Sequence, residues 1–244
     1  MLSFDLPPDV ILPVDRIDVR LDKDQHPFER DHAQAINENW QREIERNPAL
    51  FDGTVVLLSK LSYADRVLSG TCHPVRFATF MHWRNNRATP GAAHAFAHAM
   101  LVAGDGALVA IRMGSHTVSA GRVYFAAGSF EPSDFFDGVV DVDYNMIREV
   151  REETGLDLER ASRGQRCHVL STQRGTVIFR RYRMAESAEA IAALIEEHVA
   201  NEAEPEISGP VIIRSVDDLP EGLMPHMLPL VQWHFANPHS GSQL

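Results

Sequence analysis

The alternation of hydrophobic and polar positions predicts a chain of mixed strands and helices. Apolar residues recur at helical spacing over 28–46, 188–199 and 227–235, with Pro48 ending the first segment. The segment 74–83 is ambiguous, and its apolar offsets favour a short helix. Apolar and β-branched runs predict strands over 10–21, 54–60, 67–71, 95–103, 107–112, 122–127, 167–172, 176–184 and 211–214.

Turn residues divide this pattern into regions. Gly104-Asp105-Gly106 and Arg174-Gly175 each separate two predicted strands, so both predict hairpins. The segment 84–91 is polar and contains Pro and Gly, which indicates a loop and a domain boundary near residue 88. We therefore predict an N-terminal α/β region over 1–88, a second domain over 89–238 and a frayed tail over 239–244.

An acidic helix is the most informative segment for function. Glu149, Glu152 and Glu153 fall within a sector of ~100° on a helix surface. Like charges this close repel one another unless a cation lies among them, and clustered carboxylate oxygens suit Mg²⁺ or Mn²⁺. Arg148 can pair with Glu152 at i, i+4, and Gly155 stands where a helix stop is expected.

The alternative interpretation is a solvated acidic face, which is common on surface helices. An apolar stripe beside the acidic sector, formed by Met146, Ile147 and Val150, indicates that the helix is docked. Upstream, an apolar run at 123–127 leads into a glycine loop that carries acids, 128–134. The predicted order is strand, glycine loop and acidic helix.

At these residues the chain resembles the Nudix hydrolase family. The family pattern is Gly, five residues, Glu, seven residues, then Arg-Glu-apolar-x-Glu-Glu-x-Gly-apolar, and residues 148–156 match every fixed position of its second half. Gly128 matches the first glycine. Asp134 stands where the family has Glu, and residues 135–147 contain an insertion of about six in what we expect to be a loop.

The resemblance implies an α/β/α sandwich around a mixed sheet, with the N-terminal region as an added α/β module. It implies water attack on phosphorus in a nucleoside diphosphate linked to another moiety, with nucleotide sugars or ADP-ribose favoured, and with Mg²⁺ or Mn²⁺ as cofactor. The residues carried over as metal ligands are Glu149, Glu152 and Glu153, and those with catalytic roles are Glu149, Arg148 and Asp134. The general base stays open among Glu149, Asp134 and the later acids Glu196, Glu197, Glu202, Glu204 and Glu206.

Residues outside the acidic helix are weaker candidates. Gly128 is expected beside the substrate. Arg112 and Arg122 flank a segment between two predicted strands, so they are candidates for substrate binding and equally for an ordinary solvent loop. Three aromatic residues near the insertion, Phe135, Phe136 and Tyr144, could stack on a base but are expected to pack in the core or loop. His98 lies on a predicted strand and His94 directly precedes it, which disfavours a metal role for this pair.

Composition narrows the class of partner. The 244 residues carry a formal net charge of -11, which argues against generic binding to nucleic acid or an anionic membrane surface. Cys72 and Cys167 are far apart and show no metal-ligand spacing, and no apolar run approaches the ~18 residues of a membrane span. We expect a cytoplasmic protein, without a secretory signal, whose partner is a small nucleotide derivative, with a homodimer as the default assembly.

Two other functions remain open from the sequence. The chain could keep the fold and bind a nucleotide-like ligand as a sensor or regulator, which the shorter acid at Asp134 and the insertion would permit. It could also be an interaction protein whose motif match is accidental, although the match from Arg148 to Gly155 together with Gly128 argues against that.

Overall fold

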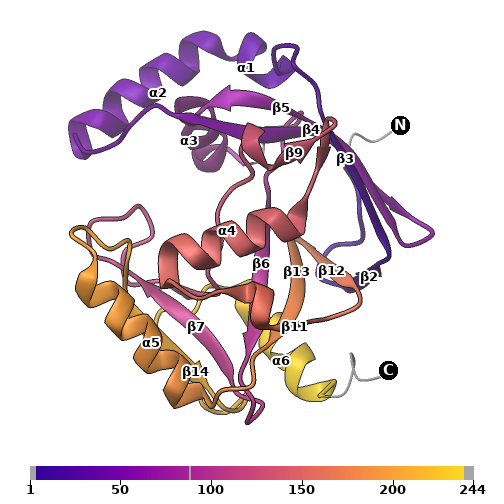
Figure 1. Cartoon of the computed structure of the whole chain (residues 1–244). Coiled ribbons are helices and arrows are strands. Elements are labelled where there is room, and N and C mark those ends of the chain that lie inside the picture. The colour runs from indigo at the N-terminus through magenta and orange to yellow at the C-terminus, as the bar shows by residue number, and fades with distance from the viewer. Residues whose placement is uncertain (1–3, 88, 239–244) are drawn as a thin grey trace. The chain divides into compact units, whose positions relative to one another are not determined.

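The protein is described by a computed structural model over residues 4–87 and 89–238 (Figure 1). Its contacts divide it into a first unit, Met1–Phe96, Ser129–Val142 and Val169–Ile178, and a second unit, Ala97–Gly128, Asp143–His168 and Phe179–Leu244. The predicted boundary near residue 88 and the tail 239–244 fall outside the described residues. The division of the chain at residue 88 therefore stays a prediction, although the two units interleave along the sequence.

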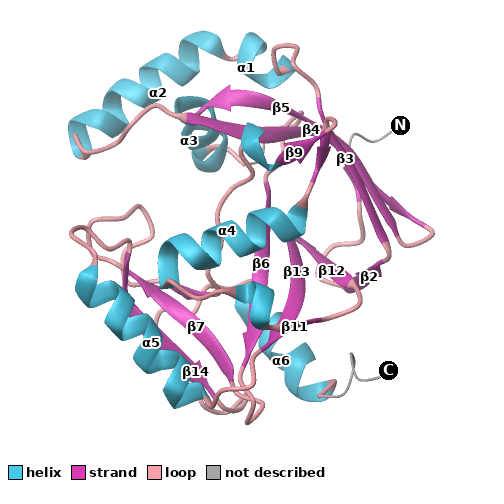
Figure 2. Cartoon of the chain, viewed as in Figure 1, coloured by secondary structure: helices cyan, strands magenta, loops and turns pink. Residues whose placement is uncertain are grey.

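The first unit contains a mixed sheet with three helices (Figure 2). The strand order in this sheet is β1 (Phe4–Asp5), β4 (Thr54–Ala64), β5 (Val67–Arg76), β3 (Arg16–Leu21), β10 (Val139–Val140) and β9 (Phe135–Phe136). Strands β4 and β5 form an antiparallel hairpin, whereas β3 runs parallel to β5. The helices are α1 (Pro27–Asp31), α2 (Ala33–Arg46) and α3 (Phe77–Asn85), and β2 (Ile11–Val14) and most of β12 (Cys167–Thr172) also belong to this unit.

The predicted helix over 28–46 is confirmed, with a break at His32 between α1 and α2. Ile36 and Trp40 on α2 pack against Ala78 and Met81 on α3, which gives this unit an apolar core. Trp83 lies in a second cluster and is 4% exposed, as expected for a core residue. The ambiguous segment 74–83 begins as strand, because β5 continues to Arg76 before α3 starts.

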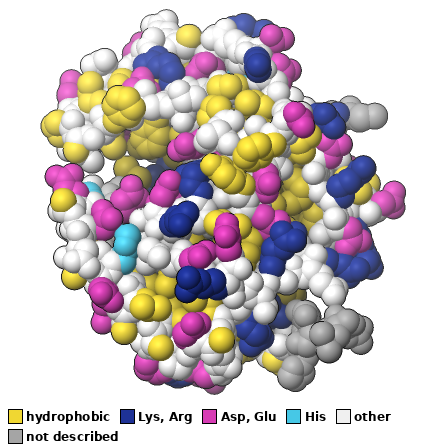
Figure 3. All heavy atoms as spheres, in the orientation of Figure 1, with side chains coloured by type: hydrophobic (Ala, Val, Ile, Leu, Met, Phe, Trp, Pro, Cys, Tyr) yellow, Lys and Arg dark blue, Asp and Glu magenta, His cyan; other side chains and the backbone are white. Residues whose placement is uncertain are grey.

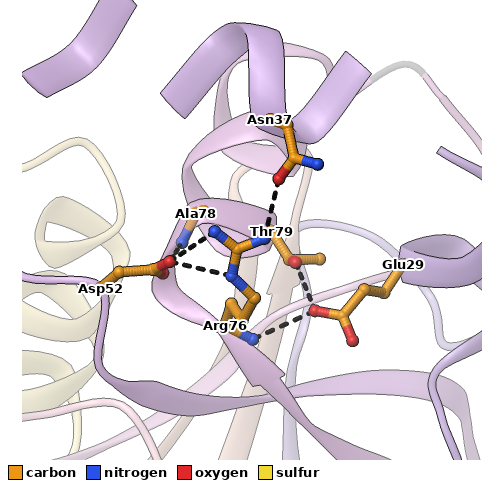
Figure 4. A network of polar contacts seen from close by, with 6 residues as sticks. All are labelled: Glu29, Asn37, Asp52, Arg76, Ala78 and Thr79. Carbon is orange, nitrogen blue, oxygen red and sulfur yellow. Dashed lines mark hydrogen bonds and ion pairs between the residues drawn. The ribbon is translucent and has the colours of Figure 1, made fainter. Parts of the chain in front are cut away.

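A polar network fixes this junction between β5 and α3 (Figure 4). Two nitrogens of Arg76 donate to Oδ2 of Asp52 at 2.6 and 2.8 Å, and a third donates to Asn37 on α2 at 2.8 Å. The other oxygen of Asp52 accepts the Ala78 N–H at 2.9 Å, and Glu29 accepts the Arg76 N–H at 3.1 Å. The network satisfies N–H groups at the start of α3 that the helix itself leaves unbonded.

The insertion is a hairpin and not the loop that we expected. Asp137 and Gly138 both have positive φ, 49° and 76°, as a two-residue type I′ turn requires. Strands β9 and β10 flank this turn, and Val139 pairs with Arg20 of β3. The Asp-Gly pair between apolar residues is the sequence signal for such a hairpin. Phe136 was expected to pack in the core or in the loop; it is 53% exposed, so it lies outside the core.

The second unit contains strands in the order β14 (Ile207–Ile213), β7 (Leu108–Met113), then the greater parts of β6 (Ala95–Val102) and β13 (Gly175–Arg183). Strand β8 (Val123–Tyr124) pairs with β7, and β11 (Ser162–Arg163) pairs with β13. Its helices are α4 (Val142–Thr154), α5 (Ala188–Asn201) and α6 (Met227–Ala236). The predicted α/β class is confirmed, as is the hairpin of β6 and β7.

Some expectations for this unit need correction. Leu194 belongs to the apolar positions that predicted α5 but is 46% exposed, because the buried stripe runs through Ile191 and Ile195. Tyr144, expected in the core or in loop packing, is 41% exposed on α4. The predicted strand over 122–127 is shorter, and the one over 211–214 starts earlier, at Ile207. Among the described residues, no helix is long and apolar enough to cross a membrane.

Candidate functional site

Helix α4 carries the acidic cluster and is docked by its apolar side. Of the predicted apolar stripe, Met146 and Val150 are buried, at 0% and 1% exposed, and Ile147 is half-buried. The Glu152 side chain faces outward and is 58% exposed, whereas the Glu149 side chain is only 12% exposed. Figure 3 shows acidic and basic side chains interspersed over the surface that α4 occupies in Figure 1.

A group of polar side chains around Asp143 anchors the first turn of α4. The Tyr182 hydroxyl donates to Asp143 at 2.6 Å, and Arg180 and Arg163 pair with the same carboxylate at 3.1 and 3.2 Å. Burial and the neighbouring carboxylate raise the pKa of the Tyr182 hydroxyl, so it remains a donor. Sequence reasoning missed this anchor, because its members lie far apart along the chain.

The C-terminal end of α4 is fixed by a glycine and a histidine. Gly155 has φ +69° and its N–H donates to the Arg151 carbonyl at 2.9 Å, so the predicted helix stop is confirmed. His198 of α5 donates from Nε2 to the Glu152 carbonyl at 3.2 Å. A Cβ on Gly155 would lie 2.7 Å from His198 Nδ1, so only glycine leaves room for this imidazole. The turn that carries Glu152 and Glu153 is therefore held by a second helix.

Arg148 lies between two of the carboxylates. One of its terminal nitrogens is 2.8 Å from Glu149 Oε1 and the other is 3.0 Å from Glu152 Oε2. The predicted pair with Glu152 is confirmed, and the pair with Glu149 is additional. The guanidinium is 18% exposed, which strengthens both charge-assisted contacts relative to a fully solvated pair.

Glu153 is the buried member of the cluster, at 8% exposure. Its Oε2 accepts the Ala127 N–H at 3.0 Å, which joins α4 to the segment before Gly128. Burial raises the pKa of the Glu153 carboxyl well above its ordinary value, and the charges of Glu149, Glu206 and Glu152 raise it further. A divalent cation beside these groups would reverse that effect.

Glu206 is a site residue that the sequence named only as one of five later acids. Its backbone carbonyl accepts the Gly114 N–H at 2.7 Å, which holds the residue beside the end of β7. Its charge is among the causes that raise the pKa of the Glu153 carboxyl. Glu202, by comparison, lies 3.8 Å from His198 on α5.

Gly128 supports the cluster from the neighbouring loop. A Cβ at this position would overlap the Glu149 carboxylate, so the absence of a side chain lets that carboxylate lie against the backbone. This close approach explains why the first position of the motif is glycine. Its predicted contact with substrate stays a prediction.

The remaining predicted site residues have local contacts of their own. Asp134, in the first unit, is fully buried and its Oδ2 accepts the Glu131 N–H at 2.8 Å in a capping arrangement. Arg112 donates to the carbonyls of Gly121 and Glu221 at 3.1 and 3.0 Å, which ties two loops of the second unit together. Arg122 is exposed. Their catalytic and substrate-binding roles stay predictions.

The described residues contain no group of three or more His, Cys, Asp or Glu side chains already arranged around a metal position. Glu149 and Glu152 are instead turned toward Arg148. His94 and His98, weighed as a metal pair, have different partners, Ser129 at 2.9 Å and His226 at 3.0 Å.

Comparison with solved structures finds Nudix proteins. The MutT protein of Methanosarcina mazei Go1 is 14% identical, with a TM-score of 0.39 over 59% of this chain and 94% of that chain. A bifunctional NMN adenylyltransferase/ADP ribose pyrophosphatase of Francisella tularensis, complexed with AMP and a Mn ion, is 12% identical, with a TM-score of 0.41 over 66% and 49%. NrtR of Shewanella oneidensis is 12% identical, with a TM-score of 0.39 over 60% and 64%.

No protein-family model matches the chain, and no curated protein matches it. With identities of 12–14% and TM-scores of 0.39–0.41, the similarity to these solved structures carries no argument about family, activity or substrate. Those rest on the residues of the acidic helix.

Proposed function

We propose that this protein is a metal-dependent Nudix hydrolase that cleaves the pyrophosphate bond of a nucleoside diphosphate linked to another moiety, of the nucleotide-sugar or ADP-ribose type. The crowding of Glu153 by Glu149, Glu152 and Glu206 carries the proposal. A buried carboxyl with three acidic neighbours is costly without a cation, and a protein has little structural use for it.

The residues fit a small divalent cation. Glu149, Glu152 and Glu153 offer hard carboxylate oxygens from adjacent turns of one helix, which is the donor chemistry of Mg²⁺ or Mn²⁺. The Glu149 carboxylate lies against the backbone of Gly128, and Glu153 uses one oxygen on the Ala127 N–H, which leaves its other oxygen for a cation. When bound, the cation would neutralise pyrophosphate charge and lower the pKa of a bound water.

The protein's own residues then have separable tasks. Arg148 holds Glu149 and Glu152 in place, while Asp143 and His198 fix the two ends of the helix that carries them. Glu206 is exposed and close enough for its charge to act on Glu153, which suits it to take the proton of the attacking water and release it to solvent. Glu149 is the other candidate for this base.

A regulator that binds a nucleotide-like ligand is the alternative. Two observations favour it: the Asp134 carboxylate is used in a capping arrangement, and Glu149 and Glu152 face Arg148. A regulator of this kind would still bind its ligand but would not turn it over.

A substrate panel separates these two functions. Nucleotide sugars, ADP-ribose, dinucleotides, coenzyme A and nucleoside triphosphates would be incubated with Mg²⁺ or Mn²⁺ and a phosphatase that reveals monophosphate products. We expect turnover of one diphosphate-linked class, and a loss of about a hundredfold or more in Glu206→Gln if this residue is the base. Binding of a panel member without any turnover would favour the regulator and contradict the hydrolase.

A further inference from the structure

Three arginines of the first unit approach one another beside Trp83. Arg84 lies in the last turn of α3, and Arg87 follows shortly after the end of that helix. The Arg87 guanidinium lies over the Trp83 ring, 5.6 Å from its centroid. Trp83 is buried and donates from its ring nitrogen to the Ala92 carbonyl at 3.0 Å, so it is a fixed support for Arg87.

The third arginine, Arg174, comes from the turn between β12 and β13. The Thr176 N–H donates to the His94 carbonyl at 2.9 Å, and the His94 ring lies 6.0 Å from the Trp83 ring. A Cβ on Gly175 would come within 3.0 Å of the same His94 carbonyl, so this turn is packed closely against the His94 backbone. These contacts bring the turn that carries Arg174 to the side of Trp83.

The pKa shifts of Arg87 and His94 agree with this grouping of arginines. Burial and the charges of Arg84 and Arg174 lower the pKa of the Arg87 guanidinium. Burial and the charges of Arg87 and Arg84 lower the pKa of His94 to about 3, so His94 is neutral at pH 7. Its Nε2 is 2.9 Å from the Ser129 hydroxyl, which fixes the ring.

No carboxylate forms an ion pair with these three arginines among the residues that the structure describes. None of the three guanidinium groups forms an ion pair or a side-chain hydrogen bond there. Arg76 in the same unit shows the contrast, because two of its nitrogens bind Asp52 and a third binds Asn37 (Figure 4). The contrast is notable in a chain with 34 acidic and 23 basic residues, where acids are the commoner neighbours.

We propose that Arg84, Arg87 and Arg174 bind a phosphoryl group of a small anionic ligand on the first unit. Three guanidinium groups can donate charge-assisted hydrogen bonds to the oxygens of one phosphate or pyrophosphate, and the bound anion relieves their mutual repulsion. Trp83 holds Arg87 in position. This phosphoryl site uses none of the acidic residues of α4, so it goes beyond the hydrolytic function proposed above.

Pyrophosphate is the probe, titrated by calorimetry into the full chain in EDTA so that no divalent cation can recruit it to α4. We expect binding by the wild type and a loss of at least about tenfold in affinity in each of Arg84→Gln, Arg87→Gln and Arg174→Gln. The matched control is Arg46→Gln, since Arg46 is an exposed arginine of the same unit that pairs with Glu43. Its affinity should equal that of the wild type.

Stability supplies a second readout. Without pyrophosphate, the triple variant should unfold at the same or a higher urea concentration than the wild type, because three repelling charges are gone. With pyrophosphate, the wild type alone should be stabilised. Absence of binding at about 10 mM pyrophosphate, or equal weakening by Arg46→Gln, would overturn the phosphoryl site.

The source of the phosphoryl group is decided by kinetics with whichever substrate is turned over. If it belongs to the substrate, Arg87→Gln raises KM with little change in kcat, and pyrophosphate competes with substrate. If it belongs to a separate ligand, KM is unchanged and pyrophosphate alters the rate without competing. The titration in EDTA needs no turnover, so it tests this site even if the hydrolase proposal fails.

Discussion

Replacing Gly155 by alanine tests how the end of α4 is held. Gly155 has φ +69°, and a Cβ there would lie 2.7 Å from Nδ1 and 2.8 Å from Cγ of His198. The substitution therefore combines an unfavourable backbone conformation with overlap against a side chain of α5. Gly121 offers a matched control in the same unit, since its φ is +70° and a Cβ there would meet nothing within 4 Å.

The cost of the backbone conformation and the cost of the overlap with His198 can be estimated separately. The left-handed conformation costs an alanine about 1–2 kcal/mol, and this should be the whole effect at Gly121. Overpacking against the imidazole adds about 1–3 kcal/mol, so Gly155→Ala should lower the free energy of unfolding by about 2–5 kcal/mol. Adding His198→Ala removes the overlap, so the double-mutant cycle should give a favourable coupling of at least about 1 kcal/mol.

Urea unfolding, followed by far-ultraviolet circular dichroism at constant pH, measures the free energy of unfolding of the wild type, the three single variants and the double variant. The midpoints should shift while the slopes with urea stay the same, since the compactness of neither state changes. Equal costs for Gly155→Ala and Gly121→Ala, together with additive effects of Gly155→Ala and His198→Ala, would refute the reasoning that this glycine makes room for the imidazole.

Two further predictions concern charge and capping. Asp52→Ala should lower the free energy of unfolding by about 1–2 kcal/mol, because the Ala78 N–H loses its acceptor. Asp52→Asn keeps an acceptor oxygen and should lower it less. Equal urea midpoints for the two variants would contradict this role of Asp52. The pKa of Glu153 is raised above its ordinary 4.5, so the folded state binds this proton more tightly than the unfolded state. Metal-free wild type should therefore lose stability relative to Glu153→Gln as pH rises above 4.5 toward the folded-state pKa of Glu153. Melting temperatures of the two proteins are measured in EDTA as a function of pH. A difference in melting temperature that does not change with pH would contradict the raised pKa.

Much of the fold followed from local signals. Apolar periodicity predicted helices that the structure contains, such as α2, α5 and α6, because each buries one face against its own unit. The hairpin of β9 and β10 was missed, although Asp137-Gly138 between apolar residues is a signal for a type I′ turn. The interleaving of the two units was not predictable, since it depends on which distant segments pack together.

The part of the candidate site that lies on the single helix α4 was predictable from the sequence. Spacing along α4 placed Glu152 correctly beside Arg148, and the structure adds the pair of Arg148 with Glu149. The contacts that hold α4 in place gave no periodic signal, because they join segments far apart in sequence. They are the group around Asp143, the contact of His198 with α4 and the effect of the Glu206 charge on Glu153. The alternation of apolar and polar residues along the strands likewise did not predict that the charge of Arg174 acts on Arg87.

Divalent-cation binding by the acidic cluster is the central claim, and thermal unfolding with and without 5 mM Mg²⁺ or Mn²⁺, roughly the millimolar range that weak carboxylate sites need, tests it most directly. The comparison is between wild type, Glu152→Gln and the control Glu159→Gln, an exposed acid outside the cluster. Metal should raise the melting temperature of wild type and Glu159→Gln but not of Glu152→Gln. Without metal, Glu152→Gln should melt at or above the wild-type temperature. A metal-induced rise of equal size in all three proteins, or none in the wild type, would show that the acidic cluster does not bind the cation.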